Sequence, residues 1–237
     1  MRFKTIHSLG SRCQNSDILK HYGLREFSGF FDFMNTHHVS IINHILADDF
    51  NQLLDKTNNK ALVCNQLTYD PETGHPLPSS IRTSNAFYNA DVNDVHSAIF
   101  PHHDLTQYRV YEHFIKCKLR FKKLRHFPTL FNYTYNTWEN KITPDDMEYM
   151  AAALEEVHGM HNYKICFIGV NQRDSGSYKN ISKGEKYDVW SLSIQPNSFT
   201  GGLFSVEQDN FNYISIIKSY EIDTDRLTKQ QIDNYEL

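Results

Sequence analysis

The sequence predicts a single-domain α/β fold, with a mostly parallel sheet flanked by helices. Apolar runs of strand length alternate with segments of helical periodicity for most of the chain, which is the pattern of parallel strands joined by crossover helices. The chain has 237 residues, of which 40% are hydrophobic and 14% aromatic, so one large core can be built. We therefore expect residues 1–237 to form one domain, without internal repeats.

The first elements are a short strand and a helix joined by a tight turn. The strand FKTIHSL ends at Gly10, and the next segment has helix punctuation at both ends. Ser11 and Gln14 have the spacing of a capping box, and Gly23 suits the left-handed position that ends a helix. A strand that turns directly into a helix is a common active-site geometry in α/β proteins.

The remaining elements follow from periodicity and from turn residues. The clearest helix covers 143–159, with Thr143 as N-cap, Pro144 at its first position and Gly159 at its end. We expect further helices over 37–55 and 107–127, an aromatic turn over 26–36, a loop over 70–82, and strands over 61–69, 95–101, 129–135, 163–170, 187–194 and 211–222.

Charge and hydropathy exclude several classes of partner. The net charge is −4 and the pI is near 6.3, so the chain lacks the basic excess of a nucleic-acid-binding protein. The first ten residues do not resemble a secretion signal, and no apolar stretch has the length of a membrane span. We expect a cytoplasmic protein that neither binds nucleic acid nor inserts into a membrane; its oligomeric state stays open.

The four cysteines form no CxxC pair and have no zinc-module spacing, so we expect thiols and no metal site. Cys64 and Cys166 lie in strand-like apolar runs, and Cys117 lies in a basic helical segment. Cys13 alone follows a turn. The histidine pair in FPHHDL fits no common metal-binding spacing.

The position of Cys13 predicts a nucleophile at the first strand-to-helix turn. With Ser11 as N-cap, the thiol lies in the helical turn whose unpaired N–H groups and dipole favour negative charge, which lowers a thiol pKa. N–H groups from Gly10, Ser11 and Arg12 to Cys13 then supply an oxyanion hole. The alternative is a structural cysteine that happens to lie near a helix start.

A nucleophilic thiol needs a general base, and FPHHDL presents two histidines after a strand and a proline. His103 is the first choice and His102 the second. Five other histidines lie at helix starts or in helical segments with solvated neighbours, which favours structural or surface roles: His37, His38, His44, His113 and His126.

An acid that orients the imidazole would complete a Cys-His-Asp arrangement. Asp32 is the first candidate because its neighbours in GFFDFM are phenylalanines, which is unusual for a merely solvated carboxylate. The alternative role for Asp32 is to cap a turn or a helix. Asp104 adjoins His103, but neighbouring side chains on an extended chain point apart, so it is the weaker candidate.

The basic segment 116–125 suggests an anion site. Lys116, Arg120 and Lys123 are the candidates for binding phosphates of coenzyme A, of a nucleotide-sugar or of an acidic polymer. The alternative is the solvated face of an amphipathic helix. SLGSRC has a single glycine, so the chain lacks a phosphate-binding loop for nucleoside triphosphate hydrolysis.

The succession SLGSRC, SGFFDFMNT, FPHHDL, KCKLRFKKLRHF and TLFNYTY resembles a bacterial family of unknown function named for papain-like cysteine peptidases. The family pattern is Ser-Leu-Gly-x-x-Cys, then Pro-Phe-Asp-Trp, then Phe-x-His-Asp-Phe, then a basic helix with paired arginines before a strand. The resemblance covers residues 1–135 and implies that the family cysteine is Cys13, its aspartate Asp32, and its His-Asp pair His103 and Asp104.

This chain departs from the family pattern in two places. The segment around Asp32 lacks both the proline and the tryptophan, and Lys122 and Lys123 replace arginines. The lost tryptophan affects a substrate wall rather than the nucleophile. A weaker similarity links the chain to cysteine-containing acyltransferases of bacterial capsule synthesis, which use coenzyme A.

Together these observations predict a cysteine peptidase or related thiol hydrolase that needs no cofactor. Cys13 would form a thioester with a peptide or an acylated small molecule or glycan, with His103 as general acid and base. The first alternative is a coenzyme A-dependent acyltransferase of surface-polysaccharide synthesis, since thioester chemistry serves hydrolysis and transfer alike. The second is a binding module without catalysis.

Overall fold

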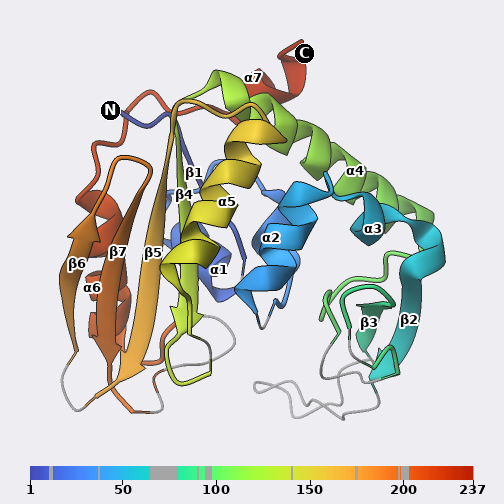
Figure 1. The fold of residues 1–237 in the computed structure, drawn as a ribbon, viewed down its shortest axis with the longest axis horizontal. Helices are drawn as coiled ribbons and strands as arrows, with labels where there is room; N and C mark the ends of the chain where they lie inside the picture. Colours follow the sequence, from blue (N-terminus) through green and yellow to red (C-terminus); the bar gives the residue numbers. More distant parts are fainter. Residues whose placement is uncertain are drawn as a thin grey trace.

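Five strands form the central sheet, in the order β1-β4-β5-β7-β6 (Figure 1). The strands β1 (Thr5–Ser8), β4 (Thr129–Asn136), β5 (Tyr163–Gln172) and β7 (Tyr187–Ile194) run parallel, and β6 (Ser177–Lys183) is an antiparallel edge strand. The computed structural model describes residues 1–10, 13–36, 38–64, 80–89, 91–93, 98–139, 141–173, 176–196, 198 and 203–236. The predicted fold class, a mostly parallel α/β sheet flanked by helices, is confirmed.

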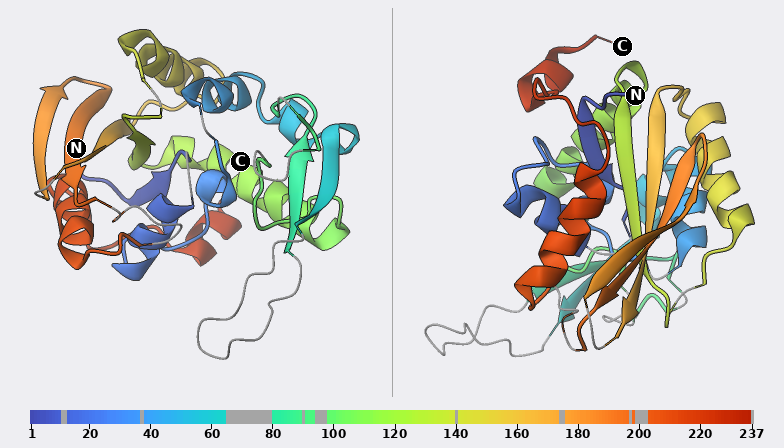
Figure 2. Two further views of the ribbon diagram at one scale, coloured as in Figure 1. Left: turned by 90° about the horizontal axis from the view of Figure 1, so that it is seen from below. Right: turned by 90° about the vertical axis from the view of Figure 1, so that its left-hand side faces the viewer.

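Two layers of helices cover the sheet (Figure 2). Helices α1 (Gln14–His21) and α6 (Glu207–Lys218) lie on one face, where Ile18, Leu19 and Tyr213 join Ile6 and Leu130 in one apolar core. The opposite face is covered by α2 (Val39–Ala47) and α5 (Pro144–Glu156).

A second core lies on the α2 and α5 side. It is rich in phenylalanine and takes in side chains of α4 (Tyr108–Lys123), including Phe114 and Phe121, together with Phe131 of β4. The remaining elements are short: α3 (Asn51–Leu54), α7 (Lys229–Asn234), and the 3-10 helices η1 (Phe30–Phe33), η2 (Lys56–Asn58) and η3 (Leu124–His126).

A separate antiparallel pair, β2 (Asn59–Cys64) and β3 (Ser80–Asn85), lies away from the main sheet, beside α3 (Figure 1). Residues 98–105 follow this pair, and Phe100 and Thr83 form an isolated antiparallel bridge. The pair therefore positions the segment that holds His102 and His103. Among the residues that the structure describes, no helix is long and apolar enough to cross a membrane.

Several elements agree with the prediction in detail. Helix α5 begins as expected: the Thr143 hydroxyl accepts from Asp146 N at 3.2 Å, and the Asp146 carboxylate accepts from Thr143 N at 2.9 Å. Gly10 and Gly23 have φ of 99° and 65°, as the predicted turns require. Helix α1 itself is shorter than expected and begins at Gln14, with Cys13 as its N-cap residue.

The expected strand over 211–222 is wrong, because the chain forms α6 over Glu207–Lys218. Its isoleucines favour a strand locally, but Asn210, Tyr213, Ile214 and Ile217 are all buried at helical spacing. Packing of that face against the sheet outweighs the intrinsic preference.

Other boundaries also differ. The expected helix over 37–55 divides into α2 and α3, because Asp49 and Phe50 have φ of 53° and 64°, and His37 lies outside the described residues. Part of the expected loop 70–82 is β3, while 65–79 lie outside the described residues. Residues 95–97 of the expected strand 95–101 also lie outside them, and 98–101 form only the isolated bridge at Phe100. The sequence did not predict strand β6, because its side chains are mostly exposed and show no alternation of apolar and polar residues.

Candidate active site

The turn after β1 lies at the carboxyl end of a parallel strand, where α/β proteins build their sites. Gly10 is fixed on several sides: its N–H donates to Ser8 Oγ at 3.1 Å, and its carbonyl accepts from Asn15 Nδ2 at 2.9 Å. A Cβ on Gly10 would lie 3.1 Å from Ile42 Cδ1 and 3.3 Å from Thr36 Oγ1. The turn is therefore tightly packed: a side chain at this position would force Ile42 or Thr36 to shift, and the φ of 99° also disfavours it.

Cys13 follows this turn as a half-buried thiol at the start of α1. Its carbonyl accepts the first helical hydrogen bond, from Asp17 N at 3.0 Å. The N–H groups of the first turn have no acceptor inside the helix, so the dipole there favours a thiolate. The Gly10 N–H is already bonded to Ser8, so it does not serve as an oxyanion donor in this conformation. Ser11 and Arg12 lie outside the described residues.

Asp32, the predicted orienting acid, is fully buried and faces α1. It accepts from Arg25 Nη1 at 2.5 Å, from Gly29 N at 2.8 Å and from the Ser16 hydroxyl. Arg25 also donates to Ser16 Oγ, so this cluster joins the 25–32 segment to the helix that begins at Cys13. Burial raises the pKa of Asp32 to about 6, against the opposing effects of Arg25, Gly29 and Ser16.

A buried histidine, His7, lies beside the cluster of Asp32, Arg25 and Ser16, and the sequence did not predict it as a site residue. A Cβ on Gly29 would lie 3.0 Å from His7 Nδ1 and 3.4 Å from Asp32 Oδ1, and neither buried atom has a hydrogen-bond partner among the residues that the structure describes. His7 Nε2 lies 3.0 Å from Thr5 Oγ1, and burial, with Arg25 nearby, lowers the pKa of His7 to about 3. The only signal in the sequence was a histidine inside a buried strand.

His102 and His103 come from a loop that β3 holds in place. Thr83 Oγ1 donates to His103 O at 2.7 Å and accepts from Leu105 N at 2.8 Å. The His103 ring packs edge-on against Phe33 and Phe114, with ring centres 4.8 and 5.7 Å apart. Burial and the neighbouring histidines His102 and His113 lower its pKa.

His102 is the member of the pair with an electrostatic partner on α1. Burial and Arg82 lower its pKa, while the charge of Asp17 acts in the opposite direction. Asp17 lies one helical turn after Cys13, so the negative charge that acts on His102 comes from the same end of α1 as the thiol. No hydrogen bond joins Asp32 to either imidazole among the residues that the structure describes.

Asp104 has a local structural role. Its Oδ1 accepts from Thr106 N at 3.0 Å and from Thr106 Oγ1 at 2.5 Å, while Oδ2 accepts from Gln107 Nε2 at 3.0 Å. Both oxygens therefore serve the turn that leads into α4. These contacts leave Asp104 as a turn-stabilising carboxylate beside His103.

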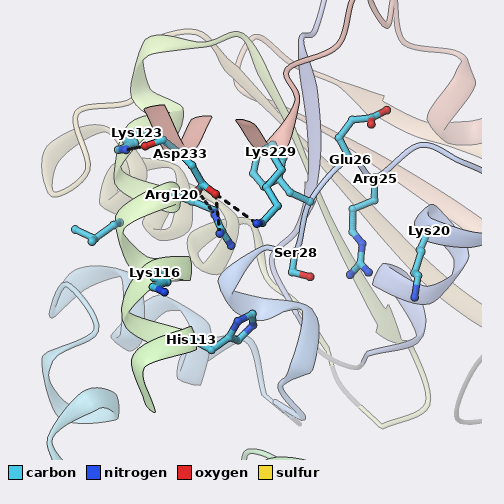
Figure 3. Close-up of a pocket in the computed structure, with 12 residues that line it drawn as sticks. Lys20, Arg25, Glu26, Ser28, His113, Lys116, Arg120, Lys123, Lys229 and Asp233 are labelled. Carbon is cyan, nitrogen blue, oxygen red and sulfur yellow. Dashed lines mark hydrogen bonds and ion pairs between the residues drawn. The ribbon is translucent and has the colours of Figure 1, made fainter. Parts of the chain in front are cut away.

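The three predicted anion-binding residues gather in one cavity of about 740 Å³ (Figure 3). Lys116, Arg120 and Lys123 enter it from α4, and sequence reasoning missed the residues that complete it from three other segments. We call it the cationic pocket; its walls are Lys20, Arg25, Glu26, Phe27, Ser28, His113, Lys116, Leu119, Arg120, Lys123, Lys229 and Asp233.

The cationic pocket and Cys13 are separate sites connected by α1 and Arg25. Lys20 lies in the last turn of α1 and Cys13 at its start, about 10 Å apart along the helix axis. Arg25 lines the pocket and also reaches Ser16 and Asp32 beside the start of α1. Across the described ranges, no three histidine, cysteine or acidic side chains gather as a metal site would require.

The comparison with known families agrees with the resemblance seen in the sequence. A family model described as "Putative papain-like cysteine peptidase (DUF1796)" matches residues 4–173, which include the β1 turn, Asp32, the histidine pair and α4. No curated protein and no solved structure matches the chain significantly. The chain thus belongs to the family described as papain-like cysteine peptidases.

Proposed function

We propose that the protein is a thiol hydrolase of the cysteine peptidase type, with Cys13 as its nucleophile. The observation that carries this proposal is the half-buried thiol at the first turn of α1, directly after the packed Gly10 turn. Cys117 and Cys166 are fully buried, and burial raises their pKa values to about 11 and 12. Among the cysteines whose side chains the structure describes, Cys13 is thus the one suited to attack a substrate.

The histidine pair supplies the proton transfers. Sequence reasoning favours His103, whereas the electrostatic partner on α1 favours His102. The ring contacts of His103 with Phe33 and Phe114 suit a residue that supports its neighbour. We therefore assign the general acid and base role to His102, with His103 packed against Phe33 and Phe114.

The chemistry follows from these groups. The His102 imidazole takes the proton of the Cys13 thiol, and the thiolate attacks the carbonyl carbon of a peptide or of an acylated small molecule or glycan, whose carbonyl electrons move to oxygen. First-turn N–H groups of α1 stabilise that oxyanion. Collapse of the intermediate breaks the bond to the leaving group, which takes a proton from the imidazolium. Water, deprotonated by the imidazole, then attacks the thioester and releases the acid and the thiolate.

Asp32 acts as a positioning residue in this proposal. Its carboxylate holds Arg25, and both groups bond Ser16 on the first turn of α1. This cluster fixes the helix that presents Cys13. The role of third triad member, expected from the sequence, would require a hydrogen bond from an imidazole to Asp32.

A peptidyl electrophile that reacts with thiols tests the proposal. We expect it to label Cys13, identified by peptide mass spectrometry, and we expect labelling to fall in His102→Ala more than in His103→Ala. Folding of each variant is checked by circular dichroism. Labelling that is confined to other cysteines, or that is unchanged in both histidine variants, would refute the proposal.

The cationic pocket supports a second candidate, a coenzyme A-dependent acyltransferase acting on a surface-polysaccharide precursor. Cys13 would form the same thioester, and a hydroxyl of the acceptor would replace water. Coenzyme A should then raise the melting temperature by an amount that grows with its concentration. A protein whose Cys13 behaves as an ordinary thiol, and that hydrolyses and transfers nothing, would instead be a binding module.

A further inference from the structure

We propose that the cationic pocket binds an organic diphosphate, meaning a ligand with two linked phosphates and an attached organic group. The proposal concerns binding alone and does not depend on catalysis by Cys13. It rests on the charge, the arrangement and the size of this pocket.

The charge of the pocket is opposite to that of the whole chain. Six cationic side chains and two carboxylates line it, an excess of four positive charges, whereas the chain carries a net charge of −4. Outside the lining, Arg226 pairs with Glu26 at 2.6 Å and Asp32 pairs with Arg25, and the charges of these two outside residues cancel, so the excess of four remains. Like charges repel unless an anion joins them, so this concentration favours a polyanionic ligand.

The cations converge from four parts of the chain. In Figure 3, Lys20 and Arg25 lie opposite the face of α4 that carries His113, Lys116, Arg120 and Lys123, and Lys229 extends from α7. A solvated helix face would present its charges to water without facing cations on other segments. The convergence is therefore typical of a binding site rather than of an amphipathic helix surface.

Two kinds of cation are present. Arg25 and Arg120 are fixed by Asp32 and Asp233, the latter through bonds of 2.6 and 3.1 Å, and so provide a rigid wall. The side chains of Lys20 and Lys116 have neither an ion pair nor a hydrogen bond with any residue that the structure describes. Their charges are available to a ligand, and phosphate oxygens are anionic groups that both lysine and arginine bind.

The pKa of His113 shows that the positive charges of the cationic pocket act together on one imidazole. Burial lowers its pKa, and Arg120, Lys116 and Lys229 lower it further, so three cations from α4 and α7 lie within electrostatic range of one imidazole. An anion bound there would reverse part of this effect. The pKa of His113 should therefore report whether an anion is bound in the cationic pocket.

The size of the pocket favours more than inorganic phosphate. A volume of about 740 Å³ lies within the range of small-molecule sites, roughly 300–1,000 Å³. Phe27 and Leu119 add apolar wall, and Leu119 is 45% exposed. A diphosphate would neutralise the cations while its organic group contacts these two side chains.

Calorimetric titration of the full chain with ADP, pyrophosphate and orthophosphate tests the proposal. We expect ADP to bind more tightly than pyrophosphate, and orthophosphate to bind most weakly. The double variant Lys20→Gln/Lys116→Gln removes the two unpaired cations without breaking a structural contact, and we expect it to weaken ADP binding by roughly tenfold or more. Lys218→Gln, an exposed charge on α6, is the matched control and should bind ADP like the wild type.

The proposal would be overturned if millimolar ADP does not bind, if orthophosphate binds as well as ADP, or if the double variant and the control lose affinity equally. Binding of a long polyanion such as heparin without ADP binding would also overturn it. NMR titration of His113 provides an independent readout: its pKa should rise when ADP binds, and should rise in unliganded Lys116→Gln as well.

Discussion

Two regions of this protein place a cysteine near a histidine or near a helix dipole, and they differ in the state of the thiol. Cys13 is half-buried at the first turn of α1. Cys117 lies in the middle of α4, with its Sγ 3.6 Å from His113 Nε2 and 4.0 Å from Arg120 Nη1. By distance alone, Cys117 and His113 would be the catalytic pair.

Burial decides between the two regions. Cys117 is fully buried, and desolvation raises its pKa to about 11 although Arg120 acts in the opposite direction. A buried thiol with that pKa is protonated at neutral pH and cannot reach a substrate. The comparison teaches that a nucleophile needs access and a stabilised anion, and that a nearby imidazole does not replace either.

The largest effect on the rate of hydrolysis should come from replacing each of the two cysteines by alanine. Cys13→Ala should lower hydrolysis by roughly 10³-fold or more, because removal of a nucleophile leaves only binding and oxyanion stabilisation. Cys117→Ala should retain most of the activity. Steady-state rates of both variants check this, and a larger loss in Cys117→Ala would reverse the assignment.

The stability of the region around Cys13 should depend on the buried ion pair between Arg25 and Asp32. Asp32→Ala leaves Arg25 with 9% of its side chain exposed and no carboxylate, which should lower the free energy of unfolding by about 3–5 kcal/mol. Urea denaturation measures it. Glu221→Ala, which breaks the exposed pair with Arg2, is the control and should unfold like the wild type. Equal behaviour of the two variants would show that the cluster does not anchor α1.

The role of the Gly10 turn can be tested by comparing alanine substitutions at Gly10 and Gly23. Gly10→Ala places a methyl group 3.1 Å from Ile42 Cδ1 at a φ of 99°, so it should cost about 2–3 kcal/mol of folding free energy and slow the reaction of Cys13. Gly23→Ala also has a positive φ but meets nothing within 4 Å, so it should cost about 1 kcal/mol. Alkylation kinetics and urea denaturation distinguish them. A Gly10→Ala protein as stable and as reactive as Gly23→Ala would contradict the packing account.

The last effect concerns the pH dependence of stability. The pKa of His7 is lowered to about 3, so between pH 3 and 6.5 the unfolded chain binds the extra proton and stability rises with pH. The pKa of Asp32 is raised to about 6, so between pH 4 and 6 the folded chain binds the proton and stability falls as pH rises. The two effects oppose each other in that window.

His7→Gln should therefore lose stability relative to the wild type as pH rises from 4 to 6, by up to about 1.4 kcal/mol per pH unit. Urea denaturation at several pH values measures this difference. His21→Gln, an exposed position at the end of α1, should parallel the wild type. A His7→Gln curve parallel to the wild type would mean that His7 is not held neutral.

The fold was predictable where local signals and packing agree. The turn at Gly10, the capping box at Thr143 and the apolar strand runs each point to the observed element. Prediction failed where packing acts alone: the isoleucines of α6 prefer strands in isolation, and β6 is an exposed edge with no apolar pattern.

The candidate site was predictable only in part. A thiol after a turn is visible in a sequence, as are the charges of α4. The pairing of Asp32 with Arg25 depends on how the chain between them folds back, and Lys229 reaches the cationic pocket from the other end of the chain. Such contacts between distant segments leave no pattern in local spacing.

The pH dependence of Cys13 alkylation by iodoacetamide, followed by peptide mass spectrometry, tests the central claim most directly. The account predicts an apparent pKa below the ~8.5 of an unperturbed thiol, and a higher value in His102→Ala, whereas Cys117 should stay unmodified in the folded protein. An ordinary thiol pKa for Cys13 that neither histidine variant changes would contradict the claim that this turn presents a nucleophile.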